Sequence, residues 1–199
     1  MPRLFTAIEI PQSVATTLSF LTGGLPSARW IDRENYHLTL RFFGDIEPRA
    51  ADELVEALDR IRRARFSLTL LGLGVFTPKK PHSIYASVEA SPELMELQAE
   101  IDRIAKRLGL PVDNRKFTPH VTIARLRQPR DRDVAIYLAQ KGAYRSPAFE
   151  AKRFGLYSSR ASLGGGPYVL EEPFHLDAGL GEDRVAVSAD AAYLGGSHP

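Results

Sequence analysis

The 199-residue sequence contains no cysteine, which excludes disulfides, thiol nucleophiles and cysteine-ligated zinc. It also has no apolar run long enough to cross a membrane, and its first residues lack the apolar stretch of a signal peptide. Neither sign of charge is in large excess: the formal net charge is only +2, which permits a small anionic substrate without requiring a bulk polyanion as partner. These absences predict a globular protein of the reducing cytoplasm that makes no contact with membrane.

Several catalytic signatures are missing as well. No Gly-x-Ser-x-Gly nucleophile elbow occurs, which argues against a Ser-His-Asp hydrolase. The run of three glycines at 164–166 is not followed by a lysine, so it is interpreted as a hairpin turn and not as a phosphate-binding loop.

One short phrase, by contrast, occurs twice. Residues 37–40 read His-Leu-Thr-Leu and residues 120–123 read His-Val-Thr-Ile. Side chains of a strand alternate between its two faces, so each copy is expected to direct its His and Thr to one face and its apolar residues into a core. With five histidines in the chain, two accidental copies are expected about one time in a thousand.

Two imidazoles and two hydroxyls suit displacement at a phosphate. A neutral His can take a proton from water while a protonated His gives one to the leaving oxygen, and the Thr hydroxyls can donate hydrogen bonds to the phosphate oxygens. A metal site is not expected, because neither phrase supplies a carboxylate or a third His. Arg41 and Arg125 are the candidate cations. Strand parity places Arg41 on the face of His37, whereas Arg125 reaches the face of His120 only if a bulge re-aims it.

The remaining sequence alternates between strand-like and helix-like segments, which predicts an α+β protein. Helices are expected at 11–21, 48–63, 91–108 and 131–140, and strands at 3–10, 28–31, 37–43, 66–75, 83–89, 121–126, 147–159 and 167–177. The two phrases follow similar strand and helix stretches, which indicates an internal duplication and two facing lobes. We expect one bilobal catalytic domain over 1–177 and a C-terminal tail over 178–199.

Residues 37–40 and 120–123 resemble the paired His-x-Thr-x motifs of the 2H phosphoesterase superfamily. The nearest match is its RNA 2′,3′-cyclic phosphodiesterase family, also called 2′-5′ RNA ligases. Segments 3–9, 35–44, 117–125 and 156–160 also resemble that family. The resemblance implies a bilobal α+β fold of two pseudo-symmetric lobes, each of antiparallel sheet and helices, with one motif strand from each lobe lining a central cleft.

The resemblance further implies metal-independent opening of a terminal 2′,3′-cyclic phosphate to a 2′-phosphate, with no cofactor. It also implies an ATP-independent 2′-5′ RNA ligase activity. His37 would be the proton donor to the departing 3′ oxygen and His120 the proton acceptor from water. The substrates would be RNA 3′ ends or nucleoside 2′,3′-cyclic phosphates, bound by a monomer.

The phosphate would be held by Thr39 and Thr122. Arg125 matches an arginine that often follows the second motif, and Phe5 is either a stacking platform for a base or a core residue. Two other classes stay open: another phosphodiesterase of the superfamily acting on small cyclic nucleotides or 2′-5′ linkages, and a non-catalytic protein that binds RNA ends.

Overall fold

The computed structural model describes residues 3–78, 80–111, 115–159 and 167–178. Its helices are α1 (Gln12–Ser19), α2 (Pro48–Leu58), α3 (Pro92–Arg107) and α4 (Asp131–Lys141), with a short 3₁₀ turn at Arg33–Asn35. Its strands are β1 (Arg3–Glu9), β2 (Ala28–Trp30), β3 (His37–Asp45), β4 (Phe66–Leu68), β5 (Leu70–Val75), β6 (Ser83–Val88), β7 (His120–Leu126), β8 (Phe149–Ala151), β9 (Arg153–Ser159) and β10 (Tyr168–His175). The predicted α+β class is confirmed. Within the described ranges, no helix is both long and apolar enough to cross a membrane.

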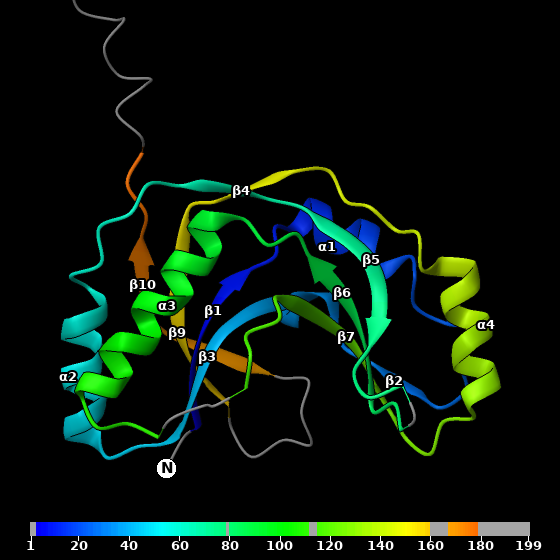
Figure 1. The fold of residues 1–199 in the computed structure, drawn as a ribbon, viewed down its shortest axis with the longest axis horizontal. Coiled ribbons are helices and arrows are strands. Elements are labelled where there is room, and N and C mark those ends of the chain that lie inside the picture. Colours follow the sequence, from blue (N-terminus) through cyan, green and yellow to red (C-terminus); the bar gives the residue numbers. More distant parts are fainter. Residues whose placement is uncertain (1–2, 79, 112–114, 160–166, 179–199) are drawn as a thin grey trace, which may run out of the picture.

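Eight of the described strands form one antiparallel sheet with two halves. Its order is β10-β9-β1-β3-β7-β6-β5, and β2 pairs with part of β7. The halves join where β3 meets β7, at the single Cα pair Leu38–Val121. Figure 1 shows β3 and β7 side by side in the middle of the fold. The two strands predicted to carry the repeated phrase are therefore direct neighbours.

Each half of the sheet has its own pair of helices. In Figure 1, α2 and α3 lie together at one end of the sheet and α4 lies at the other end. Arg63, which follows α2, donates to Glu100 of α3 at 2.6 Å, while Tyr137 of α4 donates its hydroxyl to the Leu21 carbonyl after α1 at 2.8 Å. This arrangement gives the bilobal architecture that the sequence predicts.

Helix α3 shows why these segments fold as they do. Four of its apolar residues recur at helical spacing and are buried: Leu94, Leu97, Ile101 and Ile104. The Ser91 side chain caps the helix by accepting a hydrogen bond from the Leu94 amide at 3.2 Å. The apolar stripe thus turns toward the sheet and the charged face toward solvent.

Three predicted boundaries were wrong. The strand expected at 66–75 is divided into β4 and β5, and the strand expected at 147–159 into β8 and β9, because β4 and β8 leave the main sheet and pair only with each other. The helix expected to reach residue 63 ends at Leu58, where the Ile61 amide bonds the Leu58 carbonyl in a turn. Ile61 is only 4% exposed. It is therefore a core residue although it lies beyond the end of the helix. The tail beyond 178 and the glycine turn at 164–166 lie outside the described residues.

Candidate active site

The two His-x-Thr pairs lie on one face of the sheet. Leu38 and Val121 are fully buried on the other face, so the histidines and threonines before and after them face the opposite way. Because β3 and β7 run antiparallel through the Leu38–Val121 pair, His37 lies across from Thr122, and Thr39 across from His120. The four side chains are half-buried and related by an approximate two-fold axis through that pair.

Both imidazoles are held in the same tautomer. Nδ1 of His37 lies 2.7 Å from the Asn35 carbonyl, and Nδ1 of His120 lies 2.7 Å from the Thr118 carbonyl. A carbonyl only accepts, so each Nδ1 carries the hydrogen and each neutral ring keeps its lone pair on Nε2. The geometry therefore equips either ring to act as a base, or as an acid once Nε2 is protonated.

The electrostatics of the free protein favour neutral imidazoles. Burial, with added repulsion from His120 and Arg125, lowers the pKa of His37 to about 4. Burial and Arg125 also lower the pKa of His120. The hydrogen bonds to the Asn35 and Thr118 carbonyls oppose these shifts without cancelling them. A bound anion would relieve the repulsion among these three groups.

Aromatic side chains fix the orientation of both rings. The Phe5 and Tyr168 ring centroids lie 5.2 and 4.8 Å from that of His37. On the other side of the pseudo-two-fold axis, the Phe76 and Tyr85 centroids lie 4.7 and 5.4 Å from that of His120. Each histidine is thus held by two aromatic rings and one carbonyl, an arrangement that leaves little rotational freedom.

A bulge places Arg125 at the site. In the pairing of β6 with β7, Ile84 opposes Ala124 and Tyr85 opposes Thr122, so Ile123 is an extra residue. Ile123 and Ala124 are both fully buried, and Arg125 is half-buried on the face of the histidines. The sequence predicted that Arg125 would reach the face of His120 only if a bulge occurred in the strand, and this is that bulge.

A second bulge turns Arg41 the other way, so its predicted place on the face of His37 was wrong. Ala7 opposes Thr39 and Thr6 opposes Arg41, which makes Leu40 the extra residue. Arg41 is 4% exposed and forms an ion pair with Asp102 of α3. It also donates to the Pro111 carbonyl at 2.6 Å. Arg41 therefore ties β3 to α3 and to the chain that follows it.

The Arg41→Ala protein is expected to lose about 3 kcal/mol of unfolding free energy, near the low end for one partner of a buried pair. The loss is moderate because Asp102 keeps its ion pair with Lys106 at 2.7 Å. Urea denaturation measures it. As a control, Arg49→Ala removes an exposed i,i+4 pair with Glu53 and should change stability by less than about 0.5 kcal/mol. Wild-type stability in Arg41→Ala would refute the buried role.

Phe5 offers no surface to a base. It is 1% exposed, enclosed by His37, Phe42, Tyr157 and Tyr168. Of the two interpretations given by the sequence, the structure supports packing. Phe5 belongs to a small apolar cluster, apart from the main core, that lies beneath the His37 ring.

The supporting aromatics other than Phe5 were missed by sequence reasoning. Tyr85 carried a usable signal, because it sits on a predicted strand at alternating spacing. Its ring lies across Gly74 of β5, where an added Cβ would come within 2.8 Å of the Tyr85 hydroxyl. Phe76 and Tyr168 come from segments whose pairing with the motif strands is not evident from local sequence.

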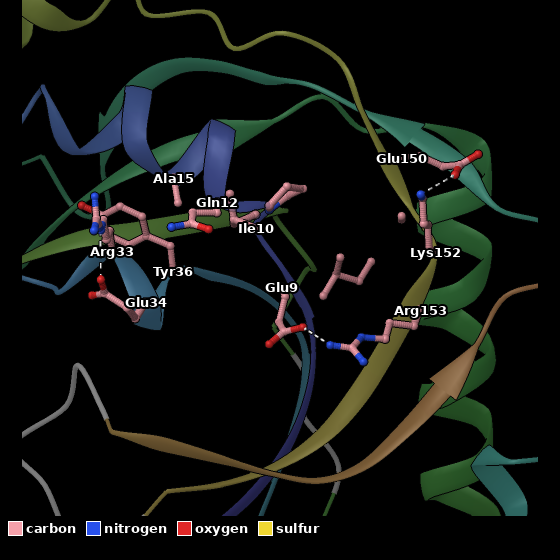
Figure 2. Close-up of a pocket in the computed structure, with 13 residues that line it drawn as sticks. Glu9, Ile10, Gln12, Ala15, Arg33, Glu34, Tyr36, Glu150, Lys152 and Arg153 are labelled. Carbon is pink, nitrogen blue, oxygen red and sulfur yellow. Dashed lines mark hydrogen bonds and ion pairs between the residues drawn. The ribbon is translucent and has the colours of Figure 1, made fainter.

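A hollow of about 850 Å³ opens at the His37 end of β1. Figure 2 shows the ion pair of Glu9 with Arg153 reaching across it, and Arg33 beside Glu34 at its edge. Glu9 opposes His37 in the sheet, so the hollow adjoins the histidine site without containing any of its four side chains. Its charged side chains are already paired with one another. In the part of the chain that the structure describes, no group of three or more His, Cys, Asp or Glu is placed to hold a metal ion.

Comparisons with known proteins agree with this geometry. A family model described as the 2′-5′ RNA ligase superfamily matches residues 24–162. An RNA 2′,3′-cyclic phosphodiesterase of Aquifex aeolicus is 33% identical over 156 residues, which is 74% of this chain and 81% of that protein. One of Geobacillus stearothermophilus is 34% identical over 128 residues, which is 61% of this chain but only 41% of the relative's length. The crystal structure of Escherichia coli LigT with 3′-AMP is 25% identical, with a TM-score of 0.72 over 88% of this chain and 98% of that one.

Proposed function

The chain belongs to the 2′-5′ RNA ligase superfamily, and we propose that it is an RNA 2′,3′-cyclic phosphodiesterase that opens a terminal cyclic phosphate to a 2′-phosphate. The observation that carries the proposal is the antiparallel pairing of the two motif strands, which places two Nε2 atoms and two hydroxyls around one space. The names of the relatives from Aquifex and Geobacillus support the substrate class.

The reaction needs two proton transfers on opposite sides of phosphorus. His120 Nε2 takes a proton from water as the water oxygen attacks phosphorus. The bond from phosphorus to the 3′ oxygen breaks, and that oxygen takes a proton from His37 Nε2, leaving the phosphate on the 2′ oxygen. The pseudo-two-fold axis suits this in-line geometry, because it sets one imidazole on each side of the phosphate.

Three further groups stabilise the negative charge that develops on the phosphate oxygens. Thr39 and Thr122 lie beside the histidines on the same face and donate their hydroxyls. The Arg125 guanidinium, close enough to lower the pKa of both imidazoles, adds positive charge. With a 5′-hydroxyl in place of water, the same transfers would form a 2′-5′ linkage, which is the ligase activity implied by the family name.

The assignment of His37 as the acid rests on the family resemblance, and the free-protein electrostatics set a condition on it. A group whose pKa is about 4 is unprotonated near neutrality. His37 can donate a proton only if the bound phosphate raises its pKa, which an anion beside an imidazole does. The three positive or protonatable groups of the site converge on the space where that anion would sit.

The purified protein is expected to convert 2′,3′-cyclic AMP, and an oligonucleotide ending in a cyclic phosphate, to the 2′-phosphate in the presence of EDTA. The proton transfers run through imidazoles, so chelation should leave the rate unchanged. Chromatography that separates 2′- from 3′-phosphate products is the decisive measurement. Exclusive 3′-phosphate would overturn the acid and base geometry. Turnover of small cyclic nucleotides but not of RNA ends would favour another phosphodiesterase of the superfamily, and binding without turnover would favour an RNA-end binder.

A further inference from the structure

The two bulges extend the correspondence between the motif strands past their His-x-Thr pairs, because each bulge follows the Thr and changes which later residue faces the histidines. In β7 the extra residue follows Thr122 and returns Arg125 to the face of the histidines. In β3 the extra residue follows Thr39, and the residue returned to that face is Phe42. Phe42 follows His37 by five positions, as Arg125 follows His120. Phe42 is therefore the pseudo-symmetric counterpart of the arginine.

The Phe42 ring lies on the histidine face and is open to solvent. Its centroid is 5.4 Å from that of Phe5, the residue that also contacts His37. Phe42 is nevertheless 54% exposed, although the neighbouring residues Arg41 and Phe43 are 4% and 2% exposed. A single exposed ring needs no explanation by itself, but this ring lies on the same face as the histidines and leaves its outer surface available to a ligand.

Its position relative to the phosphate site suits a nucleobase. Along β3, Phe42 is the next residue on this face after Thr39, about 7 Å away by strand geometry. That spacing leaves room for one sugar between a phosphate held by Thr39 and a base on Phe42. Arg125 lies beyond Thr122 at the opposite end of the site, because β3 and β7 are antiparallel. The site thus has an aromatic end and a cationic end.

We propose that Phe42 is the stacking platform for the base of the nucleotide that carries the cyclic phosphate. This rests on the proposed function and adds a binding residue to it. Phe5 contacts the ring at a tilt of 40°, and the solvent-exposed surface of the ring receives the base. Every base presents a π-face, so this contact gives affinity for a nucleotide end with little preference among bases.

The test compares a substrate that has a base with one that lacks it. For the wild type, Phe42→Ala, Phe42→Leu and Phe42→Trp, kcat/KM is measured with 2′,3′-cyclic AMP and with methyl riboside 2′,3′-cyclic phosphate. Phe42→Leu keeps apolar packing on Phe5 but removes the π-face. The matched control is Phe20→Ala, which removes an aromatic ring that is 76% exposed just beyond α1. The ratio of the two kcat/KM values isolates the base contact from any shift of Phe5 or His37.

The ratio is expected to fall about tenfold or more in Phe42→Ala and Phe42→Leu, to be retained in Phe42→Trp, and to equal the wild-type ratio in Phe20→Ala. A loss shared equally by both substrates would overturn the proposal while leaving the proposed function intact. If the wild type opens neither substrate, the proposed function fails. Calorimetry with adenosine 2′-phosphate and with sulfate then tests base stacking on Phe42 independently of catalysis. Equal nucleotide affinity in wild type and Phe42→Ala overturns the proposal.

Discussion

Replacing His37 or His120 with alanine is expected to reduce kcat for the opening of 2′,3′-cyclic AMP by about 10²–10⁴-fold, the usual contribution of one positioned acid or base. Each ring is fixed by its Nδ1 hydrogen bond and by two aromatic contacts, so its Nε2 is held in position for proton transfer. Stopped or continuous assays of the 2′-phosphate product measure the loss. His175→Ala, which removes an exposed histidine of β10, should retain the wild-type rate.

The double replacement should cost far less than the product of the two single losses, because both rings serve one transition state. A substrate whose leaving group needs no proton separates the roles. With a nitrophenyl phosphodiester, His37→Ala should recover most of its activity and His120→Ala should not. Rescue of His120→Ala alone would exchange the acid and the base. Rescue of neither, with fully multiplicative losses, would contradict a concerted pair.

Much of this site could be predicted from local sequence, because the alternation of side chains along a strand determines where its two His-x-Thr pairs point. Alternation alone places His37 and Thr39 on one face and Leu38 on the other, and the same holds for the second copy. That the two copies form one site follows from the inferred duplication, since facing lobes bring equivalent strands together. The predicted and observed α+β architecture agree for this reason.

The arginines show where parity fails. A bulge shifts every later side chain of its strand to the opposite face, and nothing in residues 37–43 or 121–126 marks its position. One such shift brings Arg125 to the histidines and the other removes Arg41 to Asp102. The bulges are visible only in the pairing with β1 and β6, which is long-range information.

Phe5 and Phe42 illustrate a related limit. Sequence patterns indicate that an aromatic residue in a strand is buried on one face, but not how much of that face a neighbouring strand covers. Phe5 lies on β1, which pairs with β3 and β9 on its two sides, and is enclosed. Its partner Phe42 lies on β3 beyond the single Leu38–Val121 pair that joins β3 to β7, and it is exposed. The sequence left Phe5 open as a base platform or a core residue, and only its burial beneath neighbouring strands favours the core role.

The alkaline limb of the pH profile is expected to lie at a lower pH for the free protein than for its complex with substrate. In the free protein, burial and nearby positive charge lower the pKa of His37 to about 4 and lower that of His120 from 6.5. The acid must be protonated, so kcat/KM, which reports the free protein, should be greatest below pH 6.5. Above its optimum it should fall about tenfold per pH unit. In the complex the phosphate anion raises the pKa of the acid, so the alkaline limb of kcat should lie at higher pH.

Sulfate binding tests, without turnover, whether a bound anion raises the pKa of the acid. Sulfate suits this test because its charge does not change over the pH range in which imidazole titrates. A group with a lowered pKa binds its proton only at low pH. If sulfate favours the protonated form, its affinity must therefore increase as the pH falls, by up to about tenfold per pH unit for each proton taken up. Calorimetry from pH 8 to 5 measures the affinity, and NMR signals of the imidazole protons report each histidine, with exposed His175 as the internal reference. Saturating sulfate should raise the pKa of His37 from about 4. An unchanged His37 pKa, or a sulfate affinity that does not vary with pH, would exclude His37 as the proton donor, because no bound anion would then supply the charge that keeps its Nε2 protonated near neutrality.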